Sequence, residues 1–306
     1  MMKKAPILVL VIALLLSGCG DGLDLENAEM IPICRPEVTP PQSKDWPLPR
    51  WGAEYARLYL QFAEPVFVDL GGADRLMRGD LELLTQCTWT YNSTCLDPSV
   101  QLESGGDEAS LAIVQGPLIS RLPEGATLRN EWRFEVTRAI SSSLTLNTGA
   151  LEGTLDLTGL RLSELKVTSD GANATITFAG LNPEELRLFE VQTGDSTLTM
   201  TGLGNANFQK LTLRGGGGTY DLRFGGGWPQ SAQAQIQLGE SNVNIFVPRE
   251  VGLRVEIQGK PPTVSANNLQ KEAESLYLSG GFEEFERQFI IRIGMAGGSL
   301  TLLWGE

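Results

Sequence analysis

The chain has 306 residues, of which 37 are acidic and 24 are basic, and its formal net charge at pH 7 is −13. A surface this acidic disfavours nucleic acid and anionic lipid headgroups as direct partners. The sequence contains no histidine, which removes the commonest general base and metal ligand and excludes Ser-His-Asp and Cys-His catalysis. We therefore expect a protein that is not an enzyme and that holds no cofactor or metal.

The N-terminal segment has the features of a bacterial export signal. Lys3 and Lys4 precede an apolar run from Ile7 to Leu16, about half the roughly 20 residues of a membrane-spanning helix. The run ends in Leu-Ser-Gly-Cys at residues 16–19, which resembles the lipobox of bacterial lipoproteins. This resemblance implies that residues 1–18 are a lipoprotein signal peptide and that Cys19 is diacylated. The alternative is an ordinary signal peptide with a chance cysteine.

Two acyl chains on one residue anchor a protein stably, so we expect an exported chain that is lipid-anchored at the cell envelope. The sequence leaves open which membrane holds the anchor. Residues 19–50 come next and are polar and rich in proline, as at Pro36, Pro40 and Pro47. This composition is typical of a flexible tether between an anchor and a folded body.

Three further cysteines, Cys34, Cys87 and Cys95, lie in a chain that we expect to be exported, and disulfides form in exported proteins. Cys87 and Cys95 are close in sequence and bracket a turn-like Tyr-Asn-Ser at residues 91–93, so we favour a disulfide between them. Cys34 is then free, intermolecular or part of another pairing.

Residues 51–139 read as a small β-rich companion domain. Short runs of alternating or continuous apolar residues are separated by glycine, proline and acidic residues; the runs are residues 56–62, 66–70, 100–102, 109–114 and 132–136. After the signal peptide, a helical period is suggested only at residues 267–274. The sequence therefore predicts an all-β protein.

Residues 140–306 contain a repeat. The glycines Gly149, Gly171, Gly194, Gly216 and Gly239 follow one another at intervals of 22, 23, 22 and 23 residues. A period in this range is typical of a supersecondary unit that stacks on copies of itself, because one unit alone cannot bury its apolar side. The prediction is a single-chain β-solenoid with repeats of about 22 residues.

Each repeat supplies two apolar–polar–apolar triplets, whose outer members face a core while the middle residue faces water. The first triplets are residues 144–146, 165–167, 186–188, 211–213 and 236–238. The second triplets are residues 155–157, 176–178, 198–200, 220–222 and 243–245. A late pair occurs at residues 291–293 and 300–302, and we expect the intervening residues 259–288 to cap the stack.

Several phrases resemble the bacterial toast-rack or adhesin-like β-solenoid lipoprotein family, whose solenoid follows an N-terminal companion domain. They are residues 69–76, 130–134, 159–165, 202–207 and 247–255, and the resemblance extends from about residue 54 to 306. A related domain forms the C-terminal part of proteins that respond to cell-wall-active antibiotics. The resemblance implies a cell-surface β-solenoid with an adhesive or envelope-stress role and carries over no catalytic residues. Gly215 to Gly218 and Gly225 to Gly227 depart from the family's single turn glycine.

Paired carboxylates are the remaining catalytic arrangement to consider. Asp156 and Asp221 occupy equivalent middle positions three rungs apart, and about 4.8 Å per rung puts them roughly 14 Å apart. That distance exceeds the roughly 9.5 Å upper limit for carboxylates in glycoside hydrolysis. On the other strand set, Lys166 and Arg187 fall one rung apart and would suit an anionic group or, more simply, solvent.

The strongest candidate site is the polar side of the second strand set, where threonine, asparagine and aspartate recur. Threonine favours half-exposed strands, and Thr or Asn ladders hydrogen-bond along a stack, so this pattern has a purely structural explanation. The functional alternative is a flat surface for a polar polymer such as a glycan. Its residues would be Thr154, Asp156, Thr175, Thr177, Thr197, Thr199, Thr219, Asp221, Asn242 and Asn244.

Two functions fit these observations. The first is a membrane-anchored surface lipoprotein that acts as a non-catalytic binding or structural module of the adhesin-like kind, with cell-wall glycan as its partner. The second is an accessory protein in cell-envelope stress sensing or signalling, with another envelope protein as its partner. If the polar ladder does not bind, the next place to look is the companion domain around Trp89 and Trp132.

Overall fold

The computed structural model describes residues 44–45, 54–73, 80–81, 99–105, 107–116, 131–259 and 263–305. The predicted signal peptide, the lipidation site and the three other cysteines lie outside these residues, as does the predicted tether except for Lys44 and Asp45, which form a short strand. Within them the chain forms strands, turns and two short 3₁₀ helices, Leu203–Ala206 and Phe282–Glu284, and no α-helix. The predicted all-β class is confirmed. No helix in this part of the chain is long and apolar enough to cross a membrane.

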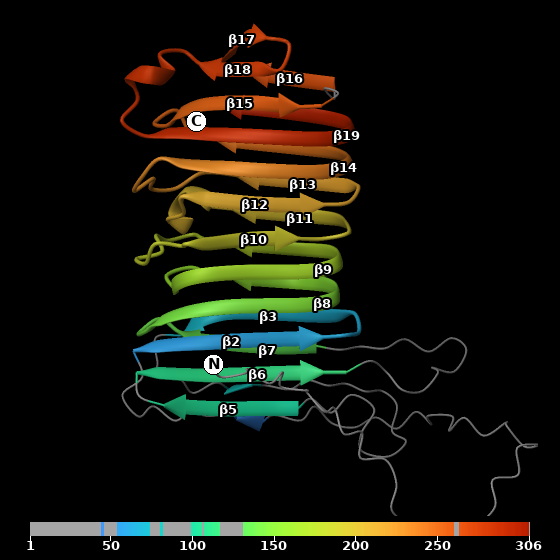
Figure 1. The fold of residues 1–306 in the computed structure, drawn as a ribbon, viewed down its shortest axis with the longest axis vertical. Helices are drawn as coiled ribbons and strands as arrows, with labels where there is room; N and C mark the ends of the chain where they lie inside the picture. The colour runs from blue at the N-terminus through green and yellow to red at the C-terminus, as the bar shows by residue number, and fades with distance from the viewer. Residues whose placement is uncertain are drawn as a thin grey trace, which may run out of the picture.

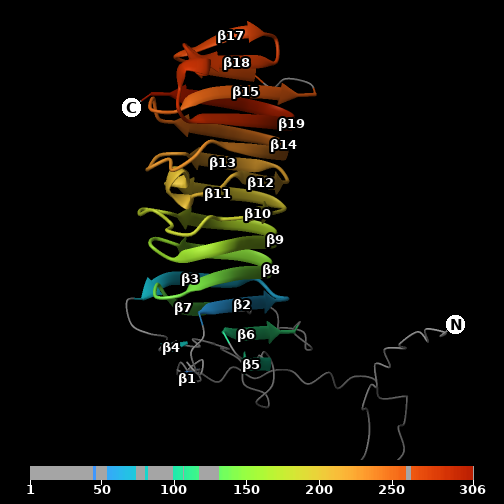
Figure 2. The ribbon, with the colours of Figure 1, turned by 60° about the vertical axis from the view of Figure 1, so that its left-hand side comes forward.

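The strands stack along the long axis of the molecule, as Figures 1 and 2 show from two directions. In chain order they are β1 Lys44–Asp45, β2 Tyr55–Phe62, β3 Val66–Ala73, β4 Asp80–Leu81, β5 Ser99–Gly105, β6 Glu108–Gln115, β7 Glu131–Thr137, β8 Ser141–Asp156, β9 Arg161–Thr177, β10 Leu188–Gln192, β11 Asp195–Thr201, β12 Lys210–Gly215, β13 Gly218–Arg223, β14 Ala232–Val247, β15 Gly252–Gln258, β16 Thr263–Asn267, β17 Leu269–Ala273, β18 Leu276–Ser279 and β19 Gln288–Trp304.

Two parallel faces enclose the core. Face A contains β6, β2, β10, β12, β15 and the first halves of β8, β9, β14 and β19; face B contains β7, β3, β11, β13, β16 and the second halves of the same four long strands. Because each long strand bends from one face to the other, the hydrogen bonding of the two faces closes into one set. We call one segment of face A with its continuation on face B a rung.

The number of residues between paired positions on successive rungs varies along the stack. On face A, Leu144 pairs with Leu165, Leu165 with Phe189, Phe189 with Leu211 and Leu211 with Ala234, in steps of 21, 24, 22 and 23 residues. Two triplets predicted from the sequence are therefore wrong. Residues 189–191 take the place of 186–188, and residues 234–236 take the place of 236–238 in the row.

The physical reason for the first correction is a longer connection between face B of one rung and face A of the next. Leu186 is fully buried there and forms an isolated bridge with Phe208, so its triplet belongs to the connection rather than to the sheet. Apolar residues at a corner satisfy the same alternation as those in a strand. The sequence pattern alone does not distinguish the two positions.

Alternation produces the predicted core. Most inward residues of both faces are aliphatic, and buried aromatic side chains pack on one another, including a continuous series through Phe178, Phe189, Phe208 and Phe289. Phe62 packs on Trp132 with ring centroids 4.8 Å apart at one end, and Phe224 packs on Phe289 at 4.5 Å toward the other. Since Trp132 is buried in this core, its ring offers no binding surface.

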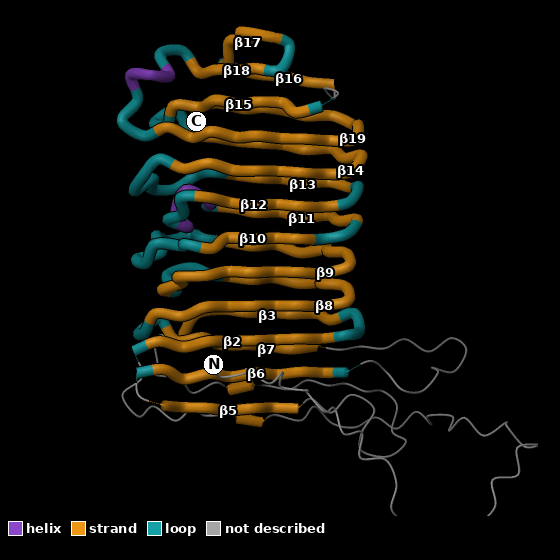
Figure 3. Tube along the Cα trace, viewed as in Figure 1, coloured by secondary structure: helices purple, strands orange, loops and turns teal. Residues whose placement is uncertain are grey.

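Two kinds of corner join the faces, and Figure 3 shows tight bends along one edge of the stack and longer loops along the other. At the tight edge, which we call the glycine corner, Gly216 donates its N–H to the carbonyl of Gly194 (2.9 Å) and Gly239 donates to Gly216 (3.0 Å). Three of the five recurring glycines thus stack on one another, whereas Gly194 itself donates to the carbonyl of Ser169. A Cβ atom on Gly194 would overlap the carbonyl oxygen of Asp170, so the close approach of the backbones requires glycine.

The rungs at both ends are out of chain order. β2 and β3 pair with β8 on one side and with β6 and β7 on the other, although β6 and β7 follow them in the sequence. At the opposite end β19 lies between β14 and the outermost rung, which consists of β15 and β16, although both strands precede β19 in the sequence (Figure 1).

Antiparallel strands lie beyond the end rungs of face A. β5 pairs antiparallel with β6, and the hairpin of β17 and β18 pairs antiparallel with β15. The described part of residues 259–288 therefore covers one end of the stack, as the sequence predicts. The region with the suggested helical period, residues 267–274, contains the strand β17 instead of a helix.

Candidate polymer-binding face

The polar residues proposed from the sequence all lie on the outside of face B. None of the ten is buried, and five are exposed: Thr154, Thr197, Thr219, Asn242 and Asn244. Their neighbours toward the interior, such as Leu155, Ile176 and Met200, are fully buried. The strand geometry thus presents these side chains to solvent in regular rows.

The rows differ from the predicted ones because paired positions on β9 and β11 of face B are 24 residues apart, as they are on β9 and β10 of face A. Thr175 pairs with Thr154 on one side and with Thr199 on the other, and Thr177 pairs with Thr201. Thr197 pairs with Asn173 rather than with Thr175. The predicted ladder is corrected to three rows.

The first row contains Asn173, Thr197, Thr219, Asn242 and Ser299. The second contains Thr154, Thr175, Thr199, Asp221, Asn244 and Thr301. The third begins with Asp156, Thr177 and Thr201. The same two-residue shift corrects the predicted core column, because Met200 pairs with Ile176 and not with Phe178.

Some polar groups of face B are occupied by hydrogen bonds to their neighbours. The Thr201 hydroxyl donates to the Thr177 hydroxyl (3.1 Å), and the Ser299 hydroxyl donates to the amide oxygen of Asn242 (2.7 Å). The carboxylate of Asp156 accepts from the backbone N–H of Thr158 (3.1 Å). These residues have a structural role. The hydroxyls of Thr154, Thr175, Thr197 and Thr199 make no such side-chain bond among the described residues.

Face B has a hollow near the end of β13, with a volume of about 730 Å³. It is lined by Thr201, Asp221, Arg223, Asn244, Phe246 and Leu303 among others. A separate hollow on face A has a volume of about 880 Å³. Arg223 lies two residues after Asp221 on the same strand. Its Nε donates to Oδ1 (3.2 Å) and Oδ2 (3.1 Å), and its Nη2 donates to Oδ2 (2.8 Å).

The hydrogen bonds to Asp221, and secondarily its charge, raise the pKa of Arg223 above its usual value. The two side chains therefore form an ion pair without net charge on the outer surface of face B. Arg223, Phe246 and Leu303 follow one another in a row across β13, β14 and β19. Sequence reasoning found Asp221 and Asn244 but missed Arg223, Phe246 and Leu303, since Phe246 and Leu303 alternate like solvent-facing positions yet are apolar.

Face A combines charged side chains with threonines, as in the row that contains Thr145, Lys166, Glu190 and Thr212. The predicted proximity of Lys166 and Arg187 is wrong, because Lys166 pairs with Glu190 and the Arg187 guanidinium lies 3.7 Å from the Glu164 carboxylate. The hollow on this face is lined by Tyr55, Arg57, Tyr59, Glu108, Glu164 and Arg187 among others. Each of its two arginines has a glutamate partner, since Arg57 pairs with Glu108.

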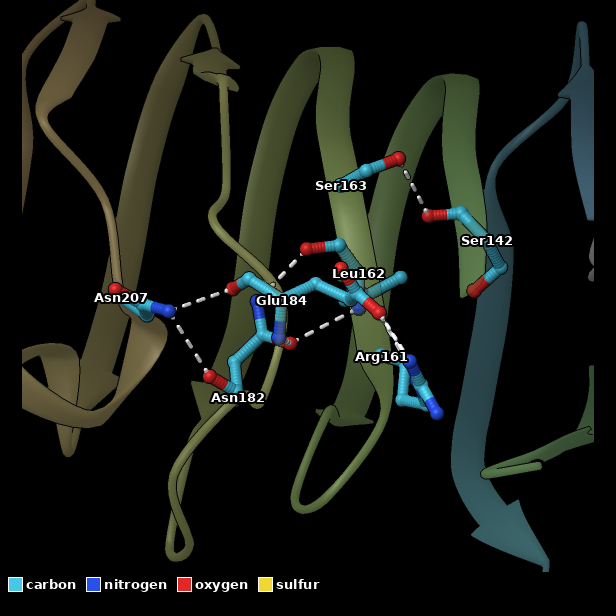
Figure 4. A network of polar contacts seen from close by, with 7 residues as sticks. All are labelled: Ser142, Arg161, Leu162, Ser163, Asn182, Glu184 and Asn207. Carbon is cyan, nitrogen blue, oxygen red and sulfur yellow. Dashed lines mark hydrogen bonds and ion pairs between the residues drawn. The ribbon is translucent and has the colours of Figure 1, made fainter. Parts of the chain in front are cut away.

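The longer loops form an asparagine corner, whose polar network is drawn in Figure 4. The buried Asn182 side chain accepts from the N–H of Leu162 (3.0 Å) and donates to its carbonyl (2.7 Å). Asn207 Nδ2 donates to the carbonyls of Asn182 (3.3 Å) and Glu184 (2.9 Å). These asparagines satisfy backbone groups that the loops leave unpaired, so we assign them a structural role.

No group of three or more histidine, cysteine, aspartate or glutamate side chains in the described part of the chain is placed to hold a metal ion. The ordered features are instead an apolar interior, a partly charged face and a mainly neutral, polar face. They define a class of protein: a stacked, parallel β structure with a regular outer surface.

Within this class, residues 66–194 match the family described as the N-terminal domain of toast_rack, DUF2154. The predicted resemblance to the toast-rack family is confirmed over these residues. The matched range begins in β3 and ends just before β11.

A crystal structure of a candidate cell adhesion protein from Clostridium sporogenes is similar to the chain with a TM-score of 0.45 and 17% sequence identity. The match covers 87% of this chain and 100% of that one. No curated protein has a matching sequence.

Proposed function

We propose that this protein is a non-catalytic binding module of the cell envelope, built as a single-chain β-solenoid with repeats of about 22 residues. The observation that carries the proposal is the set of regular rows on face B, which consist mainly of hydroxyl and amide groups and include the carboxylates of Asp156 and Asp221. Such rows repeat at the strand spacing of about 4.8 Å, so a polymer lying across them meets similar groups at every rung. Many weak contacts then add up to useful affinity.

The body is tethered by a lipid on Cys19 through residues 19–50. Replacing Cys19 by serine is expected to leave an unprocessed precursor that does not incorporate a palmitate analogue. Metabolic labelling followed by fractionation measures both properties. Labelling of the Cys19→Ser protein to the same extent as the unmodified protein would contradict the anchor.

The binding proposal is tested by retention on insoluble cell-wall glycan. The decisive variant replaces Thr154, Thr175, Thr197 and Thr199 together by valine, which keeps strand propensity and shape but removes four hydroxyls without known partners. We expect retention to fall at least tenfold while the circular dichroism spectrum and the unfolding midpoint stay close to those of the unmodified protein.

The matched control removes hydroxyls from the other face. Thr145, Thr168 and Thr212 are half-buried threonines on the outside of face A, and their joint replacement by valine is expected to leave retention unchanged. Equal loss in both variants would show that the effect is not specific to face B. If the unmodified protein is not retained, the binding module is contradicted and the accessory role in envelope stress signalling becomes the better hypothesis.

A further inference from the structure

We propose that the hollow on face B near the end of β13 is a subsite for one sugar unit of a neutral glycan. The inference rests on the proposed function of face B and adds a specific place and a ligand class to it. The rows of threonine and asparagine would align the polymer, whereas this hollow would select its chemistry.

The hollow is lined by both apolar and polar side chains. Phe246 and Leu303 are direct neighbours in the register of β14 and β19, and Leu303 is 36% exposed although it is a large aliphatic residue. Arg223 is the neighbour of Phe246 on β13, and Asp221 and Asn244 are direct neighbours in the adjacent row. A pyranose ring likewise has a face of C–H groups and an edge of hydroxyl groups, so the hollow matches its two surfaces.

Polar groups in the hollow are available for a ligand. Nε and Nη2 of Arg223 are bonded to Asp221, but Nη1 makes no hydrogen bond to any described residue, and neither does the side-chain amide of Asn244. A guanidinium and an amide side by side provide donors and an acceptor for two adjacent hydroxyls. The bonds to Asp221 also hold the guanidinium in place before a ligand arrives, which lowers the entropic cost of binding.

The charge of the site indicates a neutral ligand. Arg223 is the cation of the hollow, and Asp221 compensates it at hydrogen-bonding distance. The whole chain carries a net charge of −13, so an anionic polymer would be repelled at long range and would find no uncompensated cation in the hollow. Phosphate-rich or uronic-acid polymers are therefore poor ligands for this site.

A second hollow lies on the other side of the same apolar pair. Its volume is about 310 Å³, and its lining includes Phe246 and Leu303 together with Arg249, Asn267 and Trp304. The two side chains form a ridge between the two hollows. A chain of sugar units crossing the ridge would place consecutive units on either side of it, so binding should strengthen from one unit to two or three.

The experiment is titration of the full chain with soluble neutral oligosaccharides of one to six hexose units, followed by calorimetry. Polygalacturonate serves as the anionic comparison. We expect affinity for at least one neutral series to rise tenfold or more between one and three units, with little dependence on salt. Tight, salt-sensitive binding of polygalacturonate, with no binding of the neutral series, would overturn the proposal.

Two variants locate the binding. Phe246→Ala removes the ridge, and Asp221→Ala with Arg223→Ala removes the polar pair without changing the net charge; each is expected to weaken binding at least tenfold. The exposed pair lies outside the core, so the double variant also guards against a folding defect in Phe246→Ala. Unfolding midpoints of both variants are measured alongside.

The four-threonine variant of face B separates the two proposals, because none of its residues lines either hollow. If that variant loses retention on glycan while both hollow variants bind like the unmodified protein, the subsite is wrong and the function of face B stands. If the hollow variants lose binding and the four-threonine variant does not, the subsite stands and the rows are only structural. If no glycan binds the unmodified protein, both proposals are wrong.

Discussion

Faces A and B follow the same inward pattern and differ outward. On face A the outer rows include charged residues that interact across rungs, as where Glu256 accepts from Arg292, while Arg254 of the same strand forms an ion pair with Glu256. On face B the corresponding rows contain threonine and asparagine. The interior alternation alone therefore fixes the stack, and the outer residues are free to diverge. A difference between two faces of one sheet system is thus better evidence of function than the content of either face.

Energetics support this view. Exposed ion pairs contribute about 0–1 kcal/mol each, so the charges of face A add little to folding. Threonines at half-exposed strand positions contribute a similarly small amount through β propensity. Neither outer surface explains the stability of the stack, which comes from the shared interior.

The largest expected effect comes from breaking that interior. Phe178 is fully buried and packs edge-on against Phe189 with centroids 5.9 Å apart, so Phe178→Ala should lower the free energy of unfolding by roughly 3–5 kcal/mol. Thr177→Ala, one residue away on the outside of face B, should cost much less. Urea unfolding followed by circular dichroism compares the two. Similar losses in both variants would mean that the assignment of inner and outer positions is wrong.

A smaller effect is expected at the glycine corner, where the two faces meet. A Cβ atom at position 194 would overlap a backbone carbonyl, so Gly194→Ala should destabilise the protein by roughly 1–3 kcal/mol. Gly180 provides the control, because a Cβ atom there would lie 3.5 Å from the Thr158 methyl carbon, an ordinary contact. An unfolding midpoint for Gly194→Ala equal to that of Gly180→Ala would argue against the tight stacking of this corner.

The smallest effect is expected on the charged surface. Glu256→Gln removes the carboxylate charge that Arg254 and Arg292 share, and should lower the free energy of unfolding by about 1 kcal/mol or less. The difference from the unmodified protein should shrink further in 1 M salt, because salt screens exposed charges. Thr212→Val, on the same face, is the neutral control. A loss of several kcal/mol for Glu256→Gln would show that face A contributes to stability after all.

Alternation along each strand was sufficient to predict the all-β class, the buried residues and the outward orientation of the polar rows. It was not sufficient to align neighbouring rungs, because every rung offers a similar apolar triplet. The two extra residues between Thr177 and Leu188 shift both faces together, and Leu186 imitates a strand residue from inside the corner. The hollow was missed for a related reason, since Phe246 becomes a neighbour of Arg223 only through the register.

The position of β19 has a consequence for how the molecule forms. β19 consists of residues 288–304, and it supplies the parallel partner of β15 and β16 as well as that of β14. A chain that emerges N-terminus first therefore has no partner for the outer rung until its last residues have been made. We expect a protein truncated before Gln288 to keep the paired strands from β2 to β14 but to leave β15 and β16 without their parallel partner, so that β15 pairs only with β18. Hydrogen exchange on such a fragment would reveal one end open and the rest protected.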